Sequence, residues 1–323
     1  MGARGQQRLT IIGDVSADLV LGPISGWPRI GTETIVDHSE MRAGGSAGNA
    51  ALAVSYLGGV PELLSVVGND ETGAWLNREF GALGISLGVC DAPTTLTVGL
   101  IHSTGDRNFF TTRGHLEKLS WELLQPMLKP TRDPRAIALV SGPFLSPALQ
   151  ASYPKLLREL ASLGYRIALD TNWPPQGWSA ALRTEVAGWI SACDHVLLND
   201  LEVTSLADQE DLPTAIERVR AMLKEGAALV VKTGARGAIG FEGGRRCESG
   251  AQETRIFDSI GAGDSFNAGY LLARLDGAAL SEALAAGCRA AAAIISRFPR
   301  RSIGSGDLAQ LRAQPPATTA RRA

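Results

Sequence analysis

The chain has 323 residues, of which 45% are hydrophobic and 20% charged, and this composition excludes a mostly disordered protein. Its 31 Lys and Arg residues against 33 Asp and Glu residues give a formal net charge of −2, so no overall positive field favours a nucleic acid or an anionic membrane. The best apolar candidate for a membrane span, 278–296, is interrupted by Ser281, Glu282 and Arg289, and no signal peptide is expected. Four scattered cysteines favour a reduced, cytoplasmic protein without a zinc site.

Short apolar runs with β-type residues alternate with longer helical patterns along the chain. The runs fall at 9–12, 63–67, 136–140, 166–169, 195–198 and 228–231, and the helical patterns at 46–58, 72–83, 148–163, 179–191 and 213–225. Each run is apolar at successive positions, as a strand covered on both faces is. The alternation predicts an α/β fold, with a mostly parallel central sheet and helices on both of its faces.

Two segments, 14–43 and 97–115, interrupt this alternation. Both are rich in Gly, Thr and polar residues, and they contain β-type stretches at 34–36, 97–101 and 108–111. We predict that they form a small β-sheet lid beside an α/β core made of 1–13, 44–96 and 116–313. The edges of such a sheet suit a homodimer formed through the lid.

Two helices are expected near the C-terminal end. The first begins near Gly263 and ends near Leu275, and the second is capped by Ser281. Residues 314–323, which contain two Pro and two Thr, predict a flexible tail.

The strongest motif is the segment 258–266, which reads DSIGAGDSF. Its small residues Gly261, Ala262 and Gly263 directly precede a helix, whose first N–H groups and positive dipole end favour a phosphate. Asp264, in the first turn, could accept the proton of an attacking hydroxyl. On spacing alone, a tight turn followed by a charged first helical turn explains the motif equally well.

Six segments resemble the ribokinase-like, or PfkB-type, carbohydrate kinase family. Segment 258–266 is similar to that family's C-terminal signature, D-[ST]-x-G-A-G-D-x-F, and 44–53 resembles its glycine-rich N-terminal signature. Similar segments follow in the family's order at 13–18, 68–73, 199–202 and 232–237. The resemblance extends from about residue 8 to 303 and implies a ribokinase-like fold.

The resemblance implies an ATP-dependent kinase that transfers the γ-phosphate to a hydroxyl of a small sugar, as ribokinases and fructokinases do. Asp264 takes the role of general base, and the backbone amides of Gly261, Ala262 and Gly263 form the anion hole. Phosphoryl transfer depends mainly on positioning and charge stabilisation, which these groups can supply. A nucleoside kinase of the same fold and a catalytically inactive sugar-binding relative are the alternatives. The aromatic content of 6% offers few rings for base stacking, and the intact motif argues against an inactive relative.

By the same resemblance, sugar hydroxyls are held by Asp18, Gly44, Gly45 and Asn49. Two adjacent glycines would let a sugar ring approach the backbone, and the carboxylate and the amide supply the acceptor and donor groups that a polyol needs. Taken without the family, a helix N-terminus packed on a sheet by small residues is the favoured explanation. Arg113, in the lid, could bind a charged substituent of the substrate.

The resemblance also assigns the residues that face ATP and Mg²⁺. Asn199 would face the nucleotide phosphates and Glu202 would organise Mg²⁺ through water, although the same pair matches a helix capping box. The nucleotide-contacting turn corresponds to Lys232, Thr233, Gly234 and Gly237, whose glycines would leave room for phosphate and ribose. A simple β-turn is the alternative.

Asp258 corresponds to a candidate ligand for a monovalent cation. The later loop at 297–301 reads RFPRR, whereas cation-activated members have a small, Gly-containing loop, so the sequence argues against K⁺ dependence. Segment 170–175 resembles the D-x-N segment of some fructokinase-like and ketodeoxygluconate-kinase-like members. Pro174 stands where those members have Arg, so this segment does not support carboxylate recognition.

Overall fold

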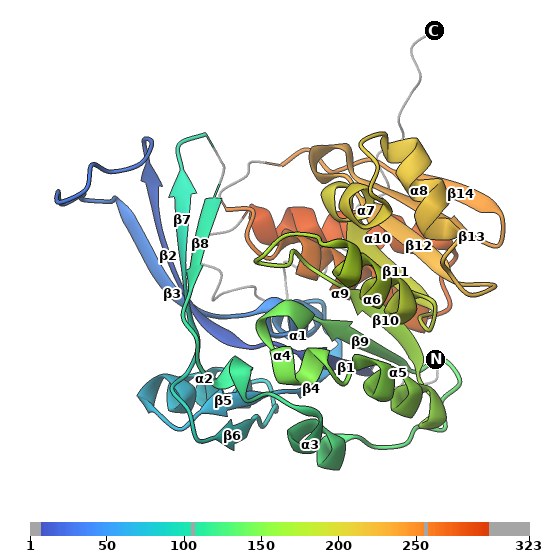
Figure 1. The fold of residues 1–323 in the computed structure, drawn as a ribbon, viewed down its shortest axis with the longest axis horizontal. Helices are drawn as coiled ribbons and strands as arrows, with labels where there is room; N and C mark the ends of the chain where they lie inside the picture. Colours follow the sequence, from blue (N-terminus) through green and yellow to red (C-terminus); the bar gives the residue numbers. More distant parts are fainter. Residues whose placement is uncertain (1–7, 105–106, 255–257, 297–323) are drawn as a thin grey trace, which may run out of the picture.

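An eight-stranded sheet runs through the centre of the protein in the computed structural model, which describes residues 8–104, 107–254 and 258–296 (Figure 1). The strand order is β14-β13-β12-β11-β10-β9-β1-β4. The bounds are β1 (Arg8–Gly13), β4 (Val60–Leu64), β9 (Ile137–Ser141), β10 (Arg166–Asp170), β11 (His195–Asn199), β12 (Ala228–Lys232), β13 (Ala238–Glu242) and β14 (Arg245–Ser249). Neighbours from β4 to β12 pair in parallel, whereas β13 and β14 are antiparallel, so the mostly parallel sheet is confirmed. The predicted tail and the 297–301 loop lie outside the described residues.

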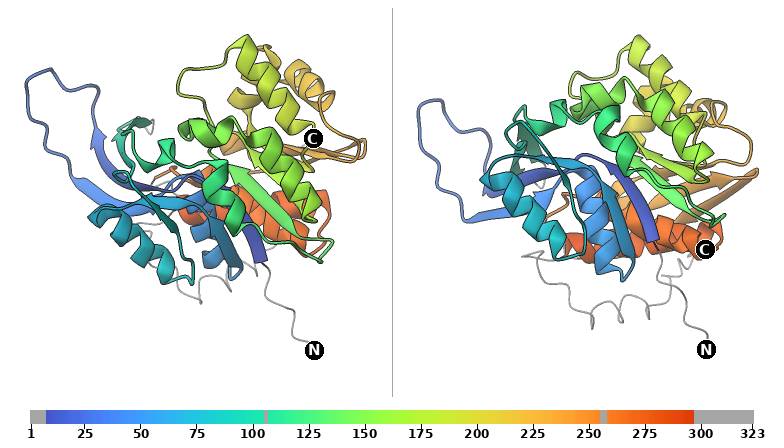
Figure 2. Two further views of the ribbon diagram at one scale, coloured as in Figure 1. Left: turned by 60° about the horizontal axis from the view of Figure 1, so that its bottom comes forward. Right: turned by 90° about the horizontal axis from the view of Figure 1, so that it is seen from below.

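Helices cover both faces of this sheet (Figures 1 and 2). One face packs against α1 (Ser46–Tyr56), α9 (Ala262–Leu275) and α10 (Leu280–Ile295), and the same hydrophobic cluster extends to α2 (Glu71–Gly81), which packs on β5 (Val66–Gly68). The other packs against α3 (Trp121–Leu124), α4 (Pro147–Gln150), α5 (Tyr153–Ser162), α6 (Ala180–Ile190), α7 (Asp200–Ala207) and α8 (Leu212–Arg220). Short 3-10 turns lie at His115–Glu117, Gln125–Met127, Pro143–Leu145 and Gly234–Arg236. Because every residue of β9 is buried, its apolar run is explained by cover on both faces.

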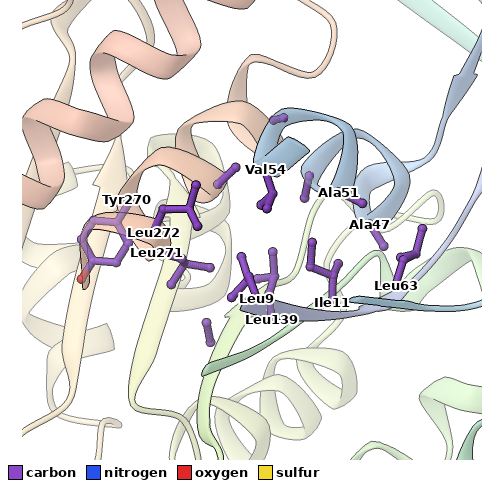
Figure 3. Packing of buried hydrophobic residues seen from close by; sticks show 14 of the residues in the cluster. Leu9, Ile11, Ala47, Ala51, Val54, Leu63, Leu139, Tyr270, Leu271 and Leu272 are labelled. Atoms are coloured by element: carbon purple, nitrogen blue, oxygen red, sulfur yellow. The ribbon is translucent and has the colours of Figure 1, made fainter. Parts of the chain in front are cut away.

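Helices α1 and α9 pack side by side over β1, β4 and β9 (Figure 3). Ala47 and Ala51 face Leu9 and Ile11 in this cluster, and they are fully buried. Small side chains on α1 let the helix approach the sheet closely, which holds its N-terminus near the N-terminus of α9. Burial of each large aliphatic side chain contributes roughly 1.5–3 kcal/mol to the stability of this contact.

The helix predicted at 148–163 is divided into α4 and α5. Pro154 is the cause, because it lacks an N–H group and is tolerated only in the first turn of a helix. From there, α5 buries Tyr153, Leu156, Leu157 and Leu160, the spacing of one helical face.

The predicted strand at 63–67 is likewise two strands. Residues up to Leu64 belong to β4, and β5 (Val66–Gly68) pairs with β6 (Gly88–Cys90) in a separate sheet. Ser65 lies between them, and its hydroxyl donates a 2.6 Å hydrogen bond to the carbonyl oxygen of Gly13. Pairing therefore changes at the one polar residue in the run.

A second, four-stranded sheet stands at one side of the body (Figure 1). It is formed by β2 (Ser16–Ile24), β3 (His38–Gly44), β7 (Leu96–His102) and β8 (Arg107–Thr111), in the order β3-β2-β7-β8. The prediction of a strand at 34–36 was wrong, because these residues form no strand. Ile35 is 91% exposed in the β2–β3 connection, which projects from the molecule and has no neighbouring strand to pair with (Figure 2).

The prediction of a helix cap at Ser281 was also wrong. Helix α10 begins at Leu280, and its N-cap is Ala279. The Glu282 carboxylate accepts a hydrogen bond of 3.0 Å from the N–H of Ala279, and this contact closes the first turn in place of a serine cap. In the part of the chain that the structure describes, no helix is both long enough and apolar enough to cross a bilayer.

Candidate active site

Polar groups gather at the carboxyl edge of the main sheet. Parallel strands end there at Gly13, Ser141, Asp170, Asn199 and Lys232. The chain places β4 on one side of β1 and β9 on the other, so the order of the strands reverses at β1. Open α/β sheets bind ligands outside the carboxyl ends of their strands at such a point.

The N-terminus of α9 faces this edge. Gly261 is its N-cap with φ of 73°, a left-handed conformation that glycine adopts without strain. A Cβ on Gly263 would lie 3.6 Å from Nζ of Lys232, so the ammonium group is adjacent to this helical turn. The amide of Ala262 donates to the carbonyl oxygen of Ser259 at 3.2 Å and closes the turn. First-turn amides have no partner within a helix, which makes this end a site for an anion.

Asp264 lies in the first turn of α9 with 8% of its surface exposed. Burial, and then the nearby charge of Asp170, raise the pKa of Asp264 well above its usual range. Lys232 and a hydrogen bond from Asn49 act in the opposite direction. The structure therefore brings together Asp264, Asn49 and Lys232, which the sequence placed in three separate motifs.

Lys232 is held by two residues that the sequence analysis did not assign to the site. Its Nζ donates to Oδ2 of Asp170 at 2.6 Å and to Oδ1 of Asn267 at 3.4 Å. Nδ2 of Asn267 donates to the same Asp170 oxygen. Burial lowers the pKa of Lys232, but Asp170 and Glu202 outweigh this effect and raise it overall. The lysine is thus a fixed positive charge among buried carboxylates.

Glu202 and Asn199 form a complete capping box at the start of α7. Asn199 Oδ1 accepts from the Glu202 N–H at 2.8 Å, and the Glu202 carboxylate accepts from the Asn199 N–H at 2.8 Å and from its side-chain amide at 2.7 Å. Burial and the charge of Asp170 raise the pKa of Glu202 to about 7. The structural explanation of this motif is therefore confirmed, and the carboxylate remains close to the Asp170–Lys232 pair.

Asp14 follows β1 directly and was not predicted as a site residue. Its two carboxylate oxygens accept from the N–H groups of Ser46 and Ala47, at 3.1 and 3.2 Å, at the start of α1. Burial raises the pKa of Asp14 to about 6, although the two hydrogen bonds act to lower it. The carboxylate also lies near Gly142, where a Cβ would be 1.9 Å from its Oδ1.

The residues assigned to the sugar come together at the junction of the two sheets. Gly44 ends β3, and a Cβ there would lie 1.9 Å from Oδ2 of Asp18 on β2. Ser16 Oγ donates to the other oxygen of Asp18 at 2.7 Å. Gly45 follows as the N-cap of α1 with φ of 81°, and Asn49 lies one turn later. The two glycines thus bring the backbone close to a carboxylate and an amide.

The turn after β12 is stabilised mainly by its own hairpin. The hydroxyl and N–H groups of Thr233 both donate to the carbonyl oxygen of Gly237, at 3.0 and 2.8 Å. A Cβ on Gly237 would lie 2.0 Å from the carbonyl oxygen of Ser249, so packing of the chain explains this glycine. Gly234 has open space around it, and it is the glycine of this turn that leaves room for a ligand.

Two predicted residues are engaged by other side chains of the protein. The Arg113 side chain is 88% exposed and forms a 2.8 Å ion pair with Glu117, one turn along the chain. Asp258 is buried, and Arg42 of β3 donates to its Oδ2 at 2.8 Å. Neither binding of a charged substituent by Arg113 nor binding of a cation by Asp258 follows from these positions.

Four residues of the site were missed or given another role: Asp14, Arg42, Asp170 and Asn267. Asp14 directly follows a buried strand and Asp170 ends one, as Asn199 and Lys232 also do. Their shared position at the carboxyl end of a buried strand could have identified Asp14 and Asp170 as site residues. Arg42 and Asn267 lie within a strand and a helix, where nothing in the sequence indicates a contact with distant residues.

The donor set is compatible with a divalent cation held through water and phosphate. No group of three His, Cys, Asp or Glu residues among the described positions could hold a metal ion directly. The buried carboxyl groups of Asp170, Glu202 and Asp264 nevertheless share the single ammonium group of Lys232, and the raised pKa of Glu202 and of Asp264 indicates that their ionised forms have too little positive charge nearby, which a bound cation would supply. Mg²⁺ usually keeps several waters and needs few protein ligands, so Glu202 fits the role assigned to it.

A helix N-terminus of small residues beside a buried carboxylate and a lysine is the kind of site on which a phosphotransferase depends. A family model described as pfkB family carbohydrate kinase matches residues 6–301. The chain therefore belongs to this family, whose members transfer a phosphoryl group to a sugar hydroxyl.

The similar proteins are distant in sequence. A 5-dehydro-2-deoxygluconokinase of Lacticaseibacillus casei is 26% identical over 268 residues, which cover 79% of this chain and 81% of that protein. A nucleoside kinase of Methanothermobacter thermautotrophicus is 26% identical, with 84% of each chain covered. The structure of adenosine kinase from Sinorhizobium meliloti gives a TM-score of 0.77 at 21% identity, covering 96% of this chain and all of the other. The structure of Arabidopsis thaliana ribokinase complexed with ribose and ATP gives a TM-score of 0.73 at 18% identity. The match covers 96% of this chain and 100% of that chain. The ribokinase-like fold is thereby confirmed.

Proposed function

We propose that this carbohydrate kinase transfers the γ-phosphate of ATP to a hydroxyl of a small sugar, with Asp264 as the general base. The observation that carries the proposal is the position of Asp264 in the first turn of α9, between Asn49 on the sugar side and Lys232 on the phosphate side. Gly261, Ala262 and Gly263 form the anion hole for the transferred group. The N–H of Ala262 must leave the Ser259 carbonyl if it is to contribute.

The sugar hydroxyl attacks the γ-phosphorus while its proton passes to the Asp264 carboxylate. The new O–P bond forms as the bond to the ADP oxygen breaks, and the electron pair leaves with ADP. The base must be ionised, and Lys232 and Asn49 favour the ionised form by opposing the effect of burial on its pKa. General base help of this kind contributes roughly 10²–10⁴-fold to the rate.

The nucleotide lies along the carboxyl edge of the sheet in this proposal. Asn199, Lys232, Thr233 and Gly234 face its phosphates and ribose, and Glu202 holds Mg²⁺ through water. When bound, Mg²⁺ supplies positive charge to the β- and γ-phosphates. We place the reaction in the cytoplasm, where thiols stay reduced, because all four cysteines are unpaired.

The substrate is a small sugar or sugar derivative bound by Asp18, Gly44, Gly45 and Asn49. Deoxygluconokinases among the similar proteins favour a keto sugar or sugar acid. Arg113 could reach a charged substituent only if the second sheet moves, since its side chain points to solvent. A nucleoside kinase is the second candidate, because a relative of that name matches 84% of the chain.

The deciding experiment is a screen for ADP release from ATP in the presence of pentoses, hexoses, ketoses, sugar acids and nucleosides. A sugar that releases ADP in proportion to a phosphorylated product supports the proposal. Turnover confined to nucleosides would favour the second candidate. Binding of a sugar without turnover would identify an inactive relative.

We also propose that the second sheet covers the sugar and joins two copies of the chain. Every residue of β8 is exposed, and Phe109 and Phe110 are half exposed on this edge strand. Edge strands with exposed apolar side chains tend to pair with another chain. Light scattering after gel filtration tests this: a dimer that becomes a monomer in a Phe110→Lys variant supports it, and a monomeric wild-type protein overturns it.

A further inference from the structure

Arg42 and Asp258 connect the second sheet to the turn that precedes α9. Arg42 lies on β3 and donates to Oδ2 of Asp258 at 2.8 Å, with side chains 8% and 5% exposed. The other oxygen of Asp258 accepts from the N–H of Ile260 at 2.8 Å. Ile260 is followed directly by Gly261, the first residue of the anion hole. One carboxylate therefore shapes this turn while it is bound to a buried guanidinium.

The positive charge of the Arg42 guanidinium is buried in this region. An arginine keeps its positive charge at any ordinary pH, and breaking a buried ion pair leaves an uncompensated charge. Glu40, also on β3, lies 3.6 Å from the same Arg42 nitrogen. Within the described residues, Nε and Nη2 of Arg42 have no hydrogen-bond partner, and both are buried. They lie beside a cavity of about 60 Å³ that Glu40, Asn49, Gly261 and other residues line.

These contacts do not fit a monovalent cation bound by Asp258. A metal ion on this carboxylate would lie close to a guanidinium that donates to one of its oxygens, and two positive charges at such separation repel strongly in a buried site. The positive charge that a cation would bring to Asp258 is already supplied by Arg42. Asp258 therefore has a counter-charge from within the chain, at 2.8 Å and closer than Glu40 is to the same nitrogen.

We propose that Arg42 is a positioning residue that replaces the monovalent cation, keeps the anion hole ordered and offsets the negative charge of Asp258 beside the incoming phosphate. The inference rests on the proposed kinase function. Without Arg42, the Asp258 carboxylate would repel the γ-phosphate, and the turn ending at Gly261 would lose its anchor. Since Arg42 lies two residues before Gly44, the same ion pair also connects the sugar-binding turn to the phosphate-binding turn.

The test compares the wild-type protein with Arg42→Gln in buffers that contain Mg²⁺ and in which large organic ions are the only monovalent cations. K⁺, Na⁺ or guanidinium is then added at constant ionic strength. Wild-type kcat is expected to change less than about twofold with any cation. In Arg42→Gln, we expect kcat to fall roughly 10- to 100-fold and KM for ATP to change less. Addition of K⁺ or guanidinium should raise the kcat of this variant at least about tenfold. Arg135→Gln, an exposed arginine paired with Asp133 near the opposite edge of the sheet, serves as the matched control.

Activation of the wild-type enzyme by K⁺ more than about fivefold would overturn the inference and leave the kinase proposal intact. The inference would also be overturned if Arg42→Gln folds with a lowered kcat that neither K⁺ nor guanidinium restores. An ion pair with a merely structural role predicts that outcome. If Arg42→Gln fails to fold, Arg42→Lys keeps a cation, and we expect it to work without K⁺; a K⁺ requirement in that variant would contradict the replacement.

A second readout does not need turnover. The melting temperature of the unliganded Arg42→Gln protein should rise with K⁺ or guanidinium more than that of the wild-type protein. If no substrate releases ADP, the kinase proposal fails, whereas this difference in melting temperature still decides whether Arg42 takes the place of a cation. An equal response of the two proteins would overturn the inference.

Discussion

Nζ of Lys232 lies 2.6 Å from Oδ2 of Asp170, which joins the ends of two strands that are 62 residues apart in the chain. Asn267 of α9 donates to the same Asp170 oxygen, so the helix that carries Asp264 is tied to this pair. The lysine is consequently held in one position relative to the first turn of α9. A fixed charge of this kind stabilises a developing negative charge without having to reorient during the reaction.

Replacement of Lys232 by Met separates the electrostatic role of this pair from its structural one. The variant leaves Asp170 buried and unpaired, so we expect the free energy of unfolding to fall by about 3–5 kcal/mol and kcat to fall by roughly 10²-fold. Addition of Asp170→Asn should restore most of the stability but not the activity. Urea unfolding and steady-state kinetics of the single and double variants check this, and recovery of kcat in the double variant would contradict it.

Asp264→Asn should lower kcat by roughly 10²–10⁴-fold without lowering stability. Since the folded-state pKa of Asp264 is raised, its ionisation destabilises the fold as pH rises through that pKa. The amide cannot ionise, and so the variant should melt at or above the wild-type temperature at pH 8. Asp276→Asn at the C-terminal end of the same helix is the control and should keep its activity. A well-folded, fully active Asp264→Asn would remove this residue from the mechanism.

Gly44→Ala tests the sugar-binding turn. The added Cβ would lie 1.9 Å from Oδ2 of Asp18, so the carboxylate must move. We expect KM for the sugar to rise at least tenfold, or about 1.4 kcal/mol, and KM for ATP to change little. Gly81→Ala places a methyl group in open space and is the matched control. An unchanged KM for the sugar in Gly44→Ala would place the substrate elsewhere.

His115 should make the fold sensitive to acid. It is fully buried, its Nδ1 accepts a 2.9 Å hydrogen bond from the N–H of Thr95, and burial lowers its pKa to about 4. A histidine whose folded-state pKa is depressed below the usual 6.5 loses stabilisation as pH falls through 6.5 towards 4. The expected loss is about 3 kcal/mol.

Urea unfolding between pH 7 and pH 4 measures this loss. His115→Asn keeps an acceptor for the Thr95 N–H but cannot take up the proton, so its stability should fall less steeply over this range. His195, whose pKa burial lowers to about 3, is present in both proteins and cancels in the comparison. Parallel pH dependences in the two proteins would contradict the assignment to His115.

The site was only partly predictable. The turn before the helix that carries Asp264 was predictable, because the requirement for small residues there is local and Gly261 and Gly263 satisfy it within three positions. The role of Asp264 came only from the resemblance to the family and stays a prediction. Asp170 and Asn267 could not, because their role exists only through a lysine on another strand. Arg42 gave no signal either, since an arginine within a strand is ordinarily solvated.

What the sequence by itself determined is local: which runs become buried strands, where Asn199 begins a helix, and which turn needs a glycine. These features depend on side chains within a few residues of one another. What only the tertiary structure decided is which carboxylates share a cation. Asp170 is paired with Lys232 and Asp258 with Arg42 across separations that no local pattern encodes. The physical reason is that a buried charge interacts strongly with whatever the fold places within a few ångströms, regardless of distance along the chain.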